Sequence, residues 1–152
     1  MKSLIVCFSY HHNNTQKIAE VMAKMLDAQV KPPEEVSPEE LLQFDLVGFG
    51  SGIYGEKYHE HLLEFVDRLL HVTNKKAFIF STSSMEEAVK NHLLLREKLK
   101  SKGYTIVDEF NCRGFNTNSF LKLFGGLNKG RPNADDLKHA KEFAMNLAIS
   151  NK

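Results

Sequence analysis

Residues 4–15 read LIVCFSYHHNNT, an apolar run that passes directly into a polar segment. The apolar part, 4–8, shows no alternation, which is typical of a strand covered on both faces in a parallel sheet. Segments of the same kind occur at 46–49, 77–80 and 104–107. The shorter segment 28–31 stops at two prolines and therefore fits an edge strand.

Helical patterns separate these strands. Apolar residues recur every three or four positions within 18–26, 62–70, 88–99 and 137–148, which places them on one face of a helix. A shorter helix is expected from Pro38 through Leu42. Strands alternating with helices predict an α/β fold: a three-layer sandwich with a five-stranded parallel sheet of order 2-1-3-4-5 and helices on both faces.

Length and composition limit the class of protein. The chain has 152 residues, and we expect a single domain over 1–152. Twenty basic residues against 19 acidic ones give a net charge of +1, which argues against nucleic acid or an anionic membrane as partner. Cys7 and Cys112 form no disulfide framework or metal-ligand motif, and no apolar stretch approaches the length of a membrane span. Because a secretory signal is also absent, we expect a cytoplasmic protein.

The predicted strand order places a binding site at the carboxyl ends of the first and third strands, where the winding of the sheet reverses. Three segments meet there: 9–15, 50–58 and 81–85. The first is rich in hydrogen-bonding groups but has no Lys or Arg. Together with the N-terminus of the following helix it predicts an anion-binding site that is built from uncharged donors. The second has three glycines and two tyrosines, which suit close approach and stacking of a flat ring. The third offers hydroxyl and amide donors.

The residues predicted to bind a cofactor therefore belong to these three segments. They are Ser9, Tyr10, His11, His12, Asn13, Asn14 and Thr15; Ser51, Gly52, Ile53, Tyr54 and Gly55; and Ser81, Thr82, Ser83 and Ser84. Purely structural roles compete for several of them: Asn14 or Thr15 as a helix N-cap, Tyr54 as lining of the core edge, and the 81–84 segment as a cap for the helix near Met85.

Other chemistries lack their residues. The sequence contains neither a G-x-G-x-x-G dinucleotide motif after the first strand nor a Walker loop, and the first strand ends without an acid. The serine in GFGSG at 48–52 is off the centre of a hydrolase elbow. Cys7, inside a strand, is interpreted as an inert buried thiol. His59 and His61 point to different sides of a helix, and no acid or Cys completes a metal site with His11 and His12.

At these motifs the sequence resembles the flavodoxin family over nearly the whole chain. Asn14 and Thr15 match the end of the family's phosphate loop, whereas Tyr10, His12 and Asn13 replace its hydroxyl and glycine residues. A sub-group of bacterial and archaeal flavodoxin-like proteins is similar in more motifs. They are SYHHNNT at 9–15, GFGSGIY at 48–54, FSTS at 80–83, CRGFNT at 112–117 and GGLNKGRPN at 125–133.

The resemblance implies a flavodoxin-like fold that binds flavin mononucleotide (FMN), with the phosphate on 9–15 and the ring between 50–58 and 81–85. It implies a redox protein that carries electrons to a partner such as a reductase or a ferredoxin-like protein. The alternatives are an FMN-dependent oxidoreductase acting on a quinone or porphyrin-type substrate, and a flavin-free interaction domain. Residues 116–131 are expected either to cover a substrate or dock a partner, or to pack phenylalanines under the fifth strand.

Overall fold

The structure is a computed structural model that describes residues 1–8, 14–52, 56–82, 85–111 and 134–151, with the side chains of 14, 56–59 and 85–91 outside the description. The strands are β1 (Ser3–Phe8), β2 (Gln29–Lys31), β3 (Leu46–Gly52), β4 (Lys75–Thr82) and β5 (Tyr104–Asn111). The helices are α1 (Asn14–Leu26), α2 (Glu56–Asp67), α3 (Met85–Ser101) and α5 (Ala134–Ser150), with the 3₁₀ turns η1 (Pro33–Glu35) and η2 (Glu40–Gln43).

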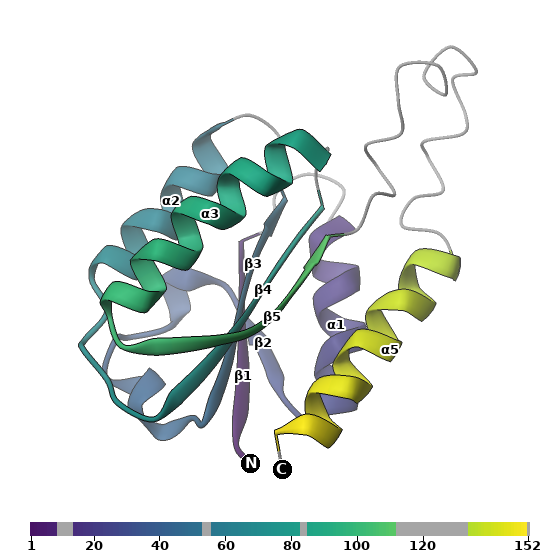
Figure 1. Cartoon of the computed structure of the whole chain (residues 1–152), viewed down its shortest axis with the longest axis horizontal. Coiled ribbons are helices and arrows are strands. Elements are labelled where there is room, and N and C mark those ends of the chain that lie inside the picture. Colours follow the sequence, from purple (N-terminus) through teal and green to yellow (C-terminus); the bar gives the residue numbers. More distant parts are fainter. Residues whose placement is uncertain (9–13, 53–55, 83–84, 112–133, 152) are drawn as a thin grey trace.

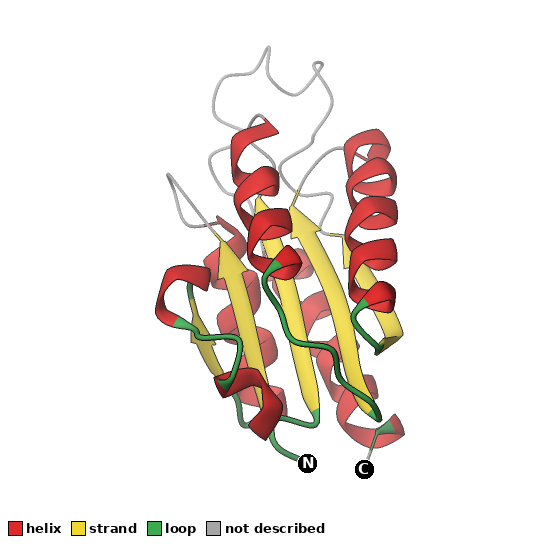
Figure 2. Cartoon of the chain, turned by 90° about the vertical axis from the view of Figure 1, so that its left-hand side faces the viewer, coloured by secondary structure: helices red, strands yellow, loops and turns green. Residues whose placement is uncertain are grey.

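The five strands form one parallel sheet of order β2-β1-β3-β4-β5. The predicted sheet order is therefore confirmed, including the position of the short strand β2 at the edge. Helices α2 and α3 cover one face, and α1 and α5 cover the other (Figure 1). Because all strands run the same way, their carboxyl ends lie along one edge of the sheet (Figure 2). None of the helices in the described part of the chain has both the length and the apolar character needed to cross a bilayer.

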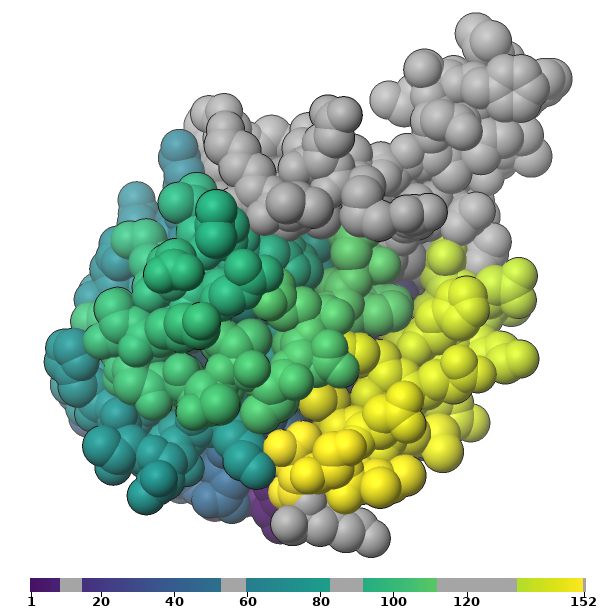
Figure 3. Space-filling model, viewed as in Figure 1, coloured from purple at the N-terminus to yellow at the C-terminus, as the bar shows by residue number. Residues whose placement is uncertain are grey.

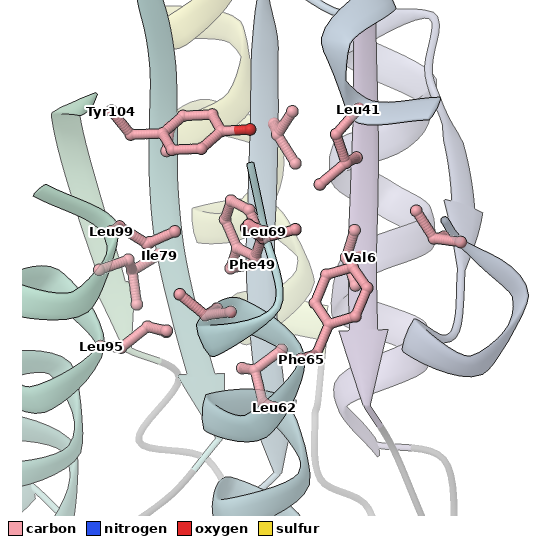
Figure 4. Close-up of a cluster of buried hydrophobic side chains, with 14 of the residues drawn as sticks. Val6, Leu41, Phe49, Leu62, Phe65, Leu69, Ile79, Leu95, Leu99 and Tyr104 are labelled. Carbon is pink, nitrogen blue, oxygen red and sulfur yellow. The ribbon is translucent and has the colours of Figure 1, made fainter. Parts of the chain in front are cut away.

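Alternate strand residues form two separate cores, one on each face. On the α2–α3 face, Phe49 and Ile79 lie beneath helix residues such as Leu62, Phe65 and Leu99 (Figure 4). The opposite core consists of neighbouring strand residues, among them Ile5, Cys7, Phe78 and Phe80, under α1 and α5. Helix α5 lies beside the edge strand β5 (Figure 3). A strand that is buried on both faces has no polar alternation, which explains its continuous apolar sequence.

Two glycines of β3 make room for aromatic rings on the α1–α5 face. Gly48 pairs with Phe78 and Gly50 pairs with Phe80 in the sheet register. A Cβ atom at either glycine would lie 2.2 Å from the ring of its partner. The rings therefore lie over the bare backbone of β3, and each glycine is needed for this close approach.

Several elements differ from their predicted extents. Strand β4 extends beyond the predicted 77–80 at both ends, and α2 ends at Asp67 although the apolar pattern continues to 70. Strand β3 continues to Gly52 and β5 continues to Asn111, beyond the predicted ends at 49 and 107. The helix expected from Pro38 is instead the 3₁₀ turn Glu40–Gln43, in which the backbone N–H groups of Leu42 and Phe44 donate to carbonyls three residues earlier. The segment is too short to gain from the propagation that stabilises an α-helix.

Strand β5 also contains an irregularity that decides where its last side chains point. Ala77 pairs with Ile106, whereas the next residue of β4, Phe78, pairs with Asp108, so Val107 is an extra residue. Such a bulge reverses the facing of the residues that follow it. Val107 and Phe110 consequently pack against the α1–α5 core. Glu109 and Asn111 point to the α3 face, where they contact His92 and Ser81.

Candidate functional site

Hydroxyl side chains gather where β3 and β4 end. Ser51, Ser81 and Thr82 are buried in the last residues of these strands, and Thr15 is buried in the first turn of α1. Helix α1 begins at Asn14, six residues after the end of β1, and has no acidic residue in its first turn. The first N–H groups of a helix have no partners within it and favour an anion. This edge therefore combines a helix N-terminus with uncharged donors.

A direct hydrogen bond joins helix α1 to the end of β4. The hydroxyls of Thr15 and Thr82 lie 2.6 Å apart, and each side chain is only 1% exposed. Two residues that are 67 positions apart in the chain are thereby held together. Because one hydroxyl donates to the other, the beginning of α1 is fixed relative to the strand that precedes Ser83 and Ser84.

A second network lies on the opposite face of the same strand. Ser81 Oγ lies 2.7 Å from His92 Nε2, and His92 Nδ1 lies 3.0 Å from Glu109 Oε1. Arg96 donates to both oxygens of Glu109, at 2.6 and 2.8 Å. Asn111 Nδ2 donates to Ser81 Oγ at 3.0 Å. These five residues link β4, α3 and β5; they are called the His92 network below.

The charges of this network follow from its contacts. Burial lowers the pKa of His92 and outweighs the opposite effect of the hydrogen bond to Glu109, so His92 is neutral at pH 7. Burial acts to raise the pKa of Glu109, but hydrogen bonds from Arg96 and His92 prevail and the pKa falls. Glu109 is therefore an ionised acceptor, His92 Nδ1 carries the proton, and Nε2 accepts from the Ser81 hydroxyl.

The predicted cofactor-binding residues are placed only in part by the structure. Thr15, Ser51, Gly52, Ser81 and Thr82 are described, and Asn14 is described as the first residue of α1. Ser51 and Gly52 belong to β3, and Ser81 and Thr82 to β4, so four residues predicted in loops are strand residues. Outside the described residues lie Ser9, Tyr10, His11, His12, Asn13, Ile53, Tyr54, Gly55, Ser83 and Ser84, together with Cys112 and 116–131.

Two other candidate groups have structural roles here. Cys7 is buried, and burial with a contribution from Glu20 raises the pKa of its thiol, as expected for an unreactive residue. The ring of His61 packs edge-on against Phe8, with centroids 5.1 Å apart. Within the described residues, no group of three or more His, Cys, Asp or Glu side chains could hold a metal ion.

The His92 network was not among the predicted sites. His92 occupies an apolar position in the repeat of α3, and a histidine there is 7% exposed, so it needs hydrogen-bond partners. A histidine at an apolar position of a helix could therefore have indicated a buried hydrogen-bond network. Its partner Glu109 could not be assigned, because the bulge at Val107 determines which face Glu109 occupies.

The sequence matches the flavodoxin domain family over residues 5–126. It is 50% identical over 148 residues to an uncharacterized protein of Methanocaldococcus jannaschii, covering 97% of this chain and 98% of that protein.

Solved structures agree on the fold. Oxidised flavodoxin 2 from Bacillus cereus superposes with a TM-score of 0.71 at 20% identity, covering 99% of each chain. A flavodoxin from the domain Archaea gives a TM-score of 0.62 at 18% identity and covers 99% of this chain and 98% of its own. Each similarity covers nearly the whole of both chains, and at this sequence identity it shows a shared fold.

Proposed function

Since the chain belongs to the flavodoxin family, we propose that it binds FMN at the carboxyl edge of its sheet and carries electrons between protein partners. The observation that carries this proposal is the start of α1 beside the buried Thr15–Thr82 pair. A helix N-terminus with neutral donors and no acid suits a phosphate dianion. The described residues therefore fit the group that the family implies.

The proposed site divides its work between segments. Residues 9–15 would hold the phosphate through backbone N–H groups and hydroxyls, and 53–55 with 83–84 would border the ring. When bound, FMN supplies the group that accepts and releases electrons. The chain's own contribution is to hold the ends of β3 and β4 in place. The Thr15–Thr82 bond supports this role because it ties the phosphate segment to the strand that leads into the ring segment.

The first experiment is the visible spectrum of the purified protein with and without added FMN, together with a calorimetric titration. Binding should give a flavin spectrum and a saturable heat. A colourless protein that ignores FMN would contradict the proposal and favour a flavin-free interaction domain. Single-electron exchange with a reductase or ferredoxin supports the carrier. Steady-state reduction of a quinone by a nicotinamide donor would instead identify an oxidoreductase.

A charge substitution tests the position of the phosphate. We expect Asn14→Asp to weaken FMN binding by about tenfold or more, because it adds a negative charge to the segment that is proposed to hold the phosphate dianion. Riboflavin, which has no phosphate, should bind the variant and the wild type equally. Folding should be unimpaired, since an acid at a helix N-terminus is favourable.

Asn146→Asp, on the exposed side of α5, is the matched control, with the same change of net charge. It should leave FMN binding unchanged. Equal loss of FMN affinity in both variants, or equal loss of riboflavin and FMN affinity in Asn14→Asp, would place the phosphate elsewhere.

A further inference from the structure

The ends of β4 and β5 are joined by Ser81, which is buried and belongs to the predicted cofactor-binding residues, and by Asn111, which is part-buried. Ser81 pairs with Asn111 in the sheet register, and Asn111 Nδ2 donates to the Ser81 hydroxyl oxygen. The same hydroxyl is bonded to His92 on α3. Ser81 is 2% exposed and His92 is 7% exposed. The next residues of the chain after β4 are Ser83 and Ser84, which belong to the predicted ring segment.

The order Ser81–His92–Glu109 is that of the nucleophile, base and carboxylate of serine hydrolases. Here the serine hydroxyl is buried and already bonded to two side chains, and the carboxylate is held at both oxygens by Arg96. We therefore assign Ser81 no nucleophilic role. What the chain of contacts does determine is the direction of each hydrogen bond.

We infer that His92 is a positioning residue for the proposed flavin site: the Arg96–Glu109 pair holds its ring, and the ring orients the Ser81 hydroxyl that joins the ends of β4 and β5. This inference rests on the proposed function. With neutral His92, Nε2 accepts from Ser81, and the Ser81 oxygen can accept from Asn111. The bulge at Val107 supports the inference, because it turns Glu109 toward His92 and Asn111 toward the Ser81 hydroxyl.

Protonation of His92 reverses one of these bonds. The added proton occupies Nε2, which then donates to Ser81 Oγ, and the Ser81 hydroxyl loses its acceptor. The other side chain on that oxygen, Asn111, holds it through its amide nitrogen, which is a donor, and would have to turn its amide over to accept from Ser81 instead. The charged groups of the described residues that act on His92 are Glu109 from β5 and Arg96 from its own helix, while β4 supplies the uncharged Ser81. Acid therefore disturbs the junction of β4 and β5.

The experiment measures FMN affinity at pH 7.5 and 5.5 for the wild type and His92→Gln. We expect the wild-type affinity to fall by about fivefold more than that of His92→Gln, which carries no ionisable group at this position. His71→Gln is the matched control, because His71 is exposed and lies before β4, at the other edge of the sheet. It should behave as the wild type. The FMN phosphate, with a pKa of about 6, titrates alike in all three proteins. The ratio of the affinity change in the wild type to that in His92→Gln therefore reports the contribution of His92 alone.

A second measurement does not depend on the variants. FMN binding and protonation of His92 are linked reciprocally. Saturating FMN should therefore lower the pKa of His92, and the change in its protonation constant should equal the change in FMN affinity caused by protonation. The NMR signals of the ring nitrogens of His92 measure this pKa. Adding FMN should leave the NMR signals of the His71 ring unchanged at each pH. An unchanged pKa of His92, or one raised by the field of the phosphate, would overturn the inference.

A second variant, Ser81→Ala, tests the inference even if His92→Gln does not fold. It removes the hydroxyl and leaves His92, Glu109 and Arg96 in place, so the acid-dependent loss of FMN affinity should disappear. If Ser81→Ala retains the full loss, His92 does not act through Ser81 and the inference is wrong. If the wild type fails to bind FMN at either pH, the proposed function fails and the inference falls with it. Binding with equal pH profiles in all variants contradicts the inference alone.

Discussion

Individual strand residues in this protein are constrained by side chains from neighbouring elements. Gly48 is required by the ring of Phe78, and Thr82 by the hydroxyl of Thr15. Sequence patterns show such residues as a small or polar interruption in a strand. They do not show the partner, because the partner comes from a distant part of the chain.

We expect Gly48→Ala to destabilise the protein by about 1–3 kcal/mol, because the new Cβ would lie 2.2 Å from Cζ of Phe78 in a packed core. Urea denaturation measures the loss. Adding Phe78→Leu removes the clashing ring, so the double variant should be more stable than the sum of the single effects by about 1 kcal/mol. Strictly additive effects would show that Phe78 is not the obstacle.

The Thr15–Thr82 pair can be tested in the same way by a double-mutant cycle. Thr82→Val keeps the shape of the side chain but leaves the buried Thr15 hydroxyl without this partner, at a cost of about 1–3 kcal/mol. We expect the double variant Thr15→Val with Thr82→Val to be nearly as stable as Thr82→Val alone, since both polar groups are then gone. Urea denaturation of the four proteins would contradict this if the two losses simply add.

The strands β1 and β4 were predictable because burial on both faces gives them continuous apolar runs, and β2 fits an edge strand because two prolines follow it. Helix α1 was predictable because its apolar residues recur every three or four positions. The ends of β3 and β5 were not, since Ser51, Glu109 and Asn111 are polar residues within strands. Glu109 and Asn111 make hydrogen bonds within the His92 network, and these contacts depend on the tertiary structure. The polar site edge was therefore predicted in composition but not in backbone geometry.

The tie between α3 and β5 makes stability depend on pH. The folded-state pKa of His92 lies below its ordinary value of 6.5, so the unfolded chain binds a proton more readily. The resulting stability is present above pH 6.5 and declines as the pH falls toward the folded-state value. The lowered pKa of Glu109 adds a further loss below its ordinary value of 4.5.

We therefore expect the free energy of unfolding of the FMN-free protein to decrease between pH 7.5 and 5.5. His92→Gln should remove most of that slope, and His71→Gln should retain it. Urea denaturation at several pH values measures the slopes. A wild-type stability that is flat or rises over this interval would contradict the assignment of a neutral, buried His92.

At the scale of the whole molecule, charge is nearly balanced, with 20 basic and 19 acidic residues. The N-terminus and the last turn of α5 lie at the edge of the sheet opposite the carboxyl ends of the strands (Figure 1). The molecule as a whole therefore has little net field to steer a charged partner, and salt at physiological strength screens exposed charges beyond about 8 Å. Partner selection must rest on local shape and contacts near the carboxyl edge.

The same balance of charge predicts the redox behaviour of bound FMN. An acidic surface repels the anionic, fully reduced flavin and makes its formation harder, whereas a net charge of +1 does not. We expect a less negative midpoint potential for the fully reduced couple than in a strongly acidic flavodoxin measured alongside. We also expect that potential to change little with ionic strength. Spectroelectrochemical titration at low and high salt measures both.

Replacing the exposed lysines Lys24, Lys100 and Lys141 by glutamate should make the couple more negative and introduce a salt dependence, because the net charge falls below zero. Replacing the same lysines by glutamine should give a smaller shift in the same direction, which separates charge from side-chain loss. A wild-type couple as negative as that of the acidic flavodoxin, or a glutamate variant that leaves it unmoved, would mean that groups next to the ring set the potential. In that case the overall charge would have no part in tuning the flavin.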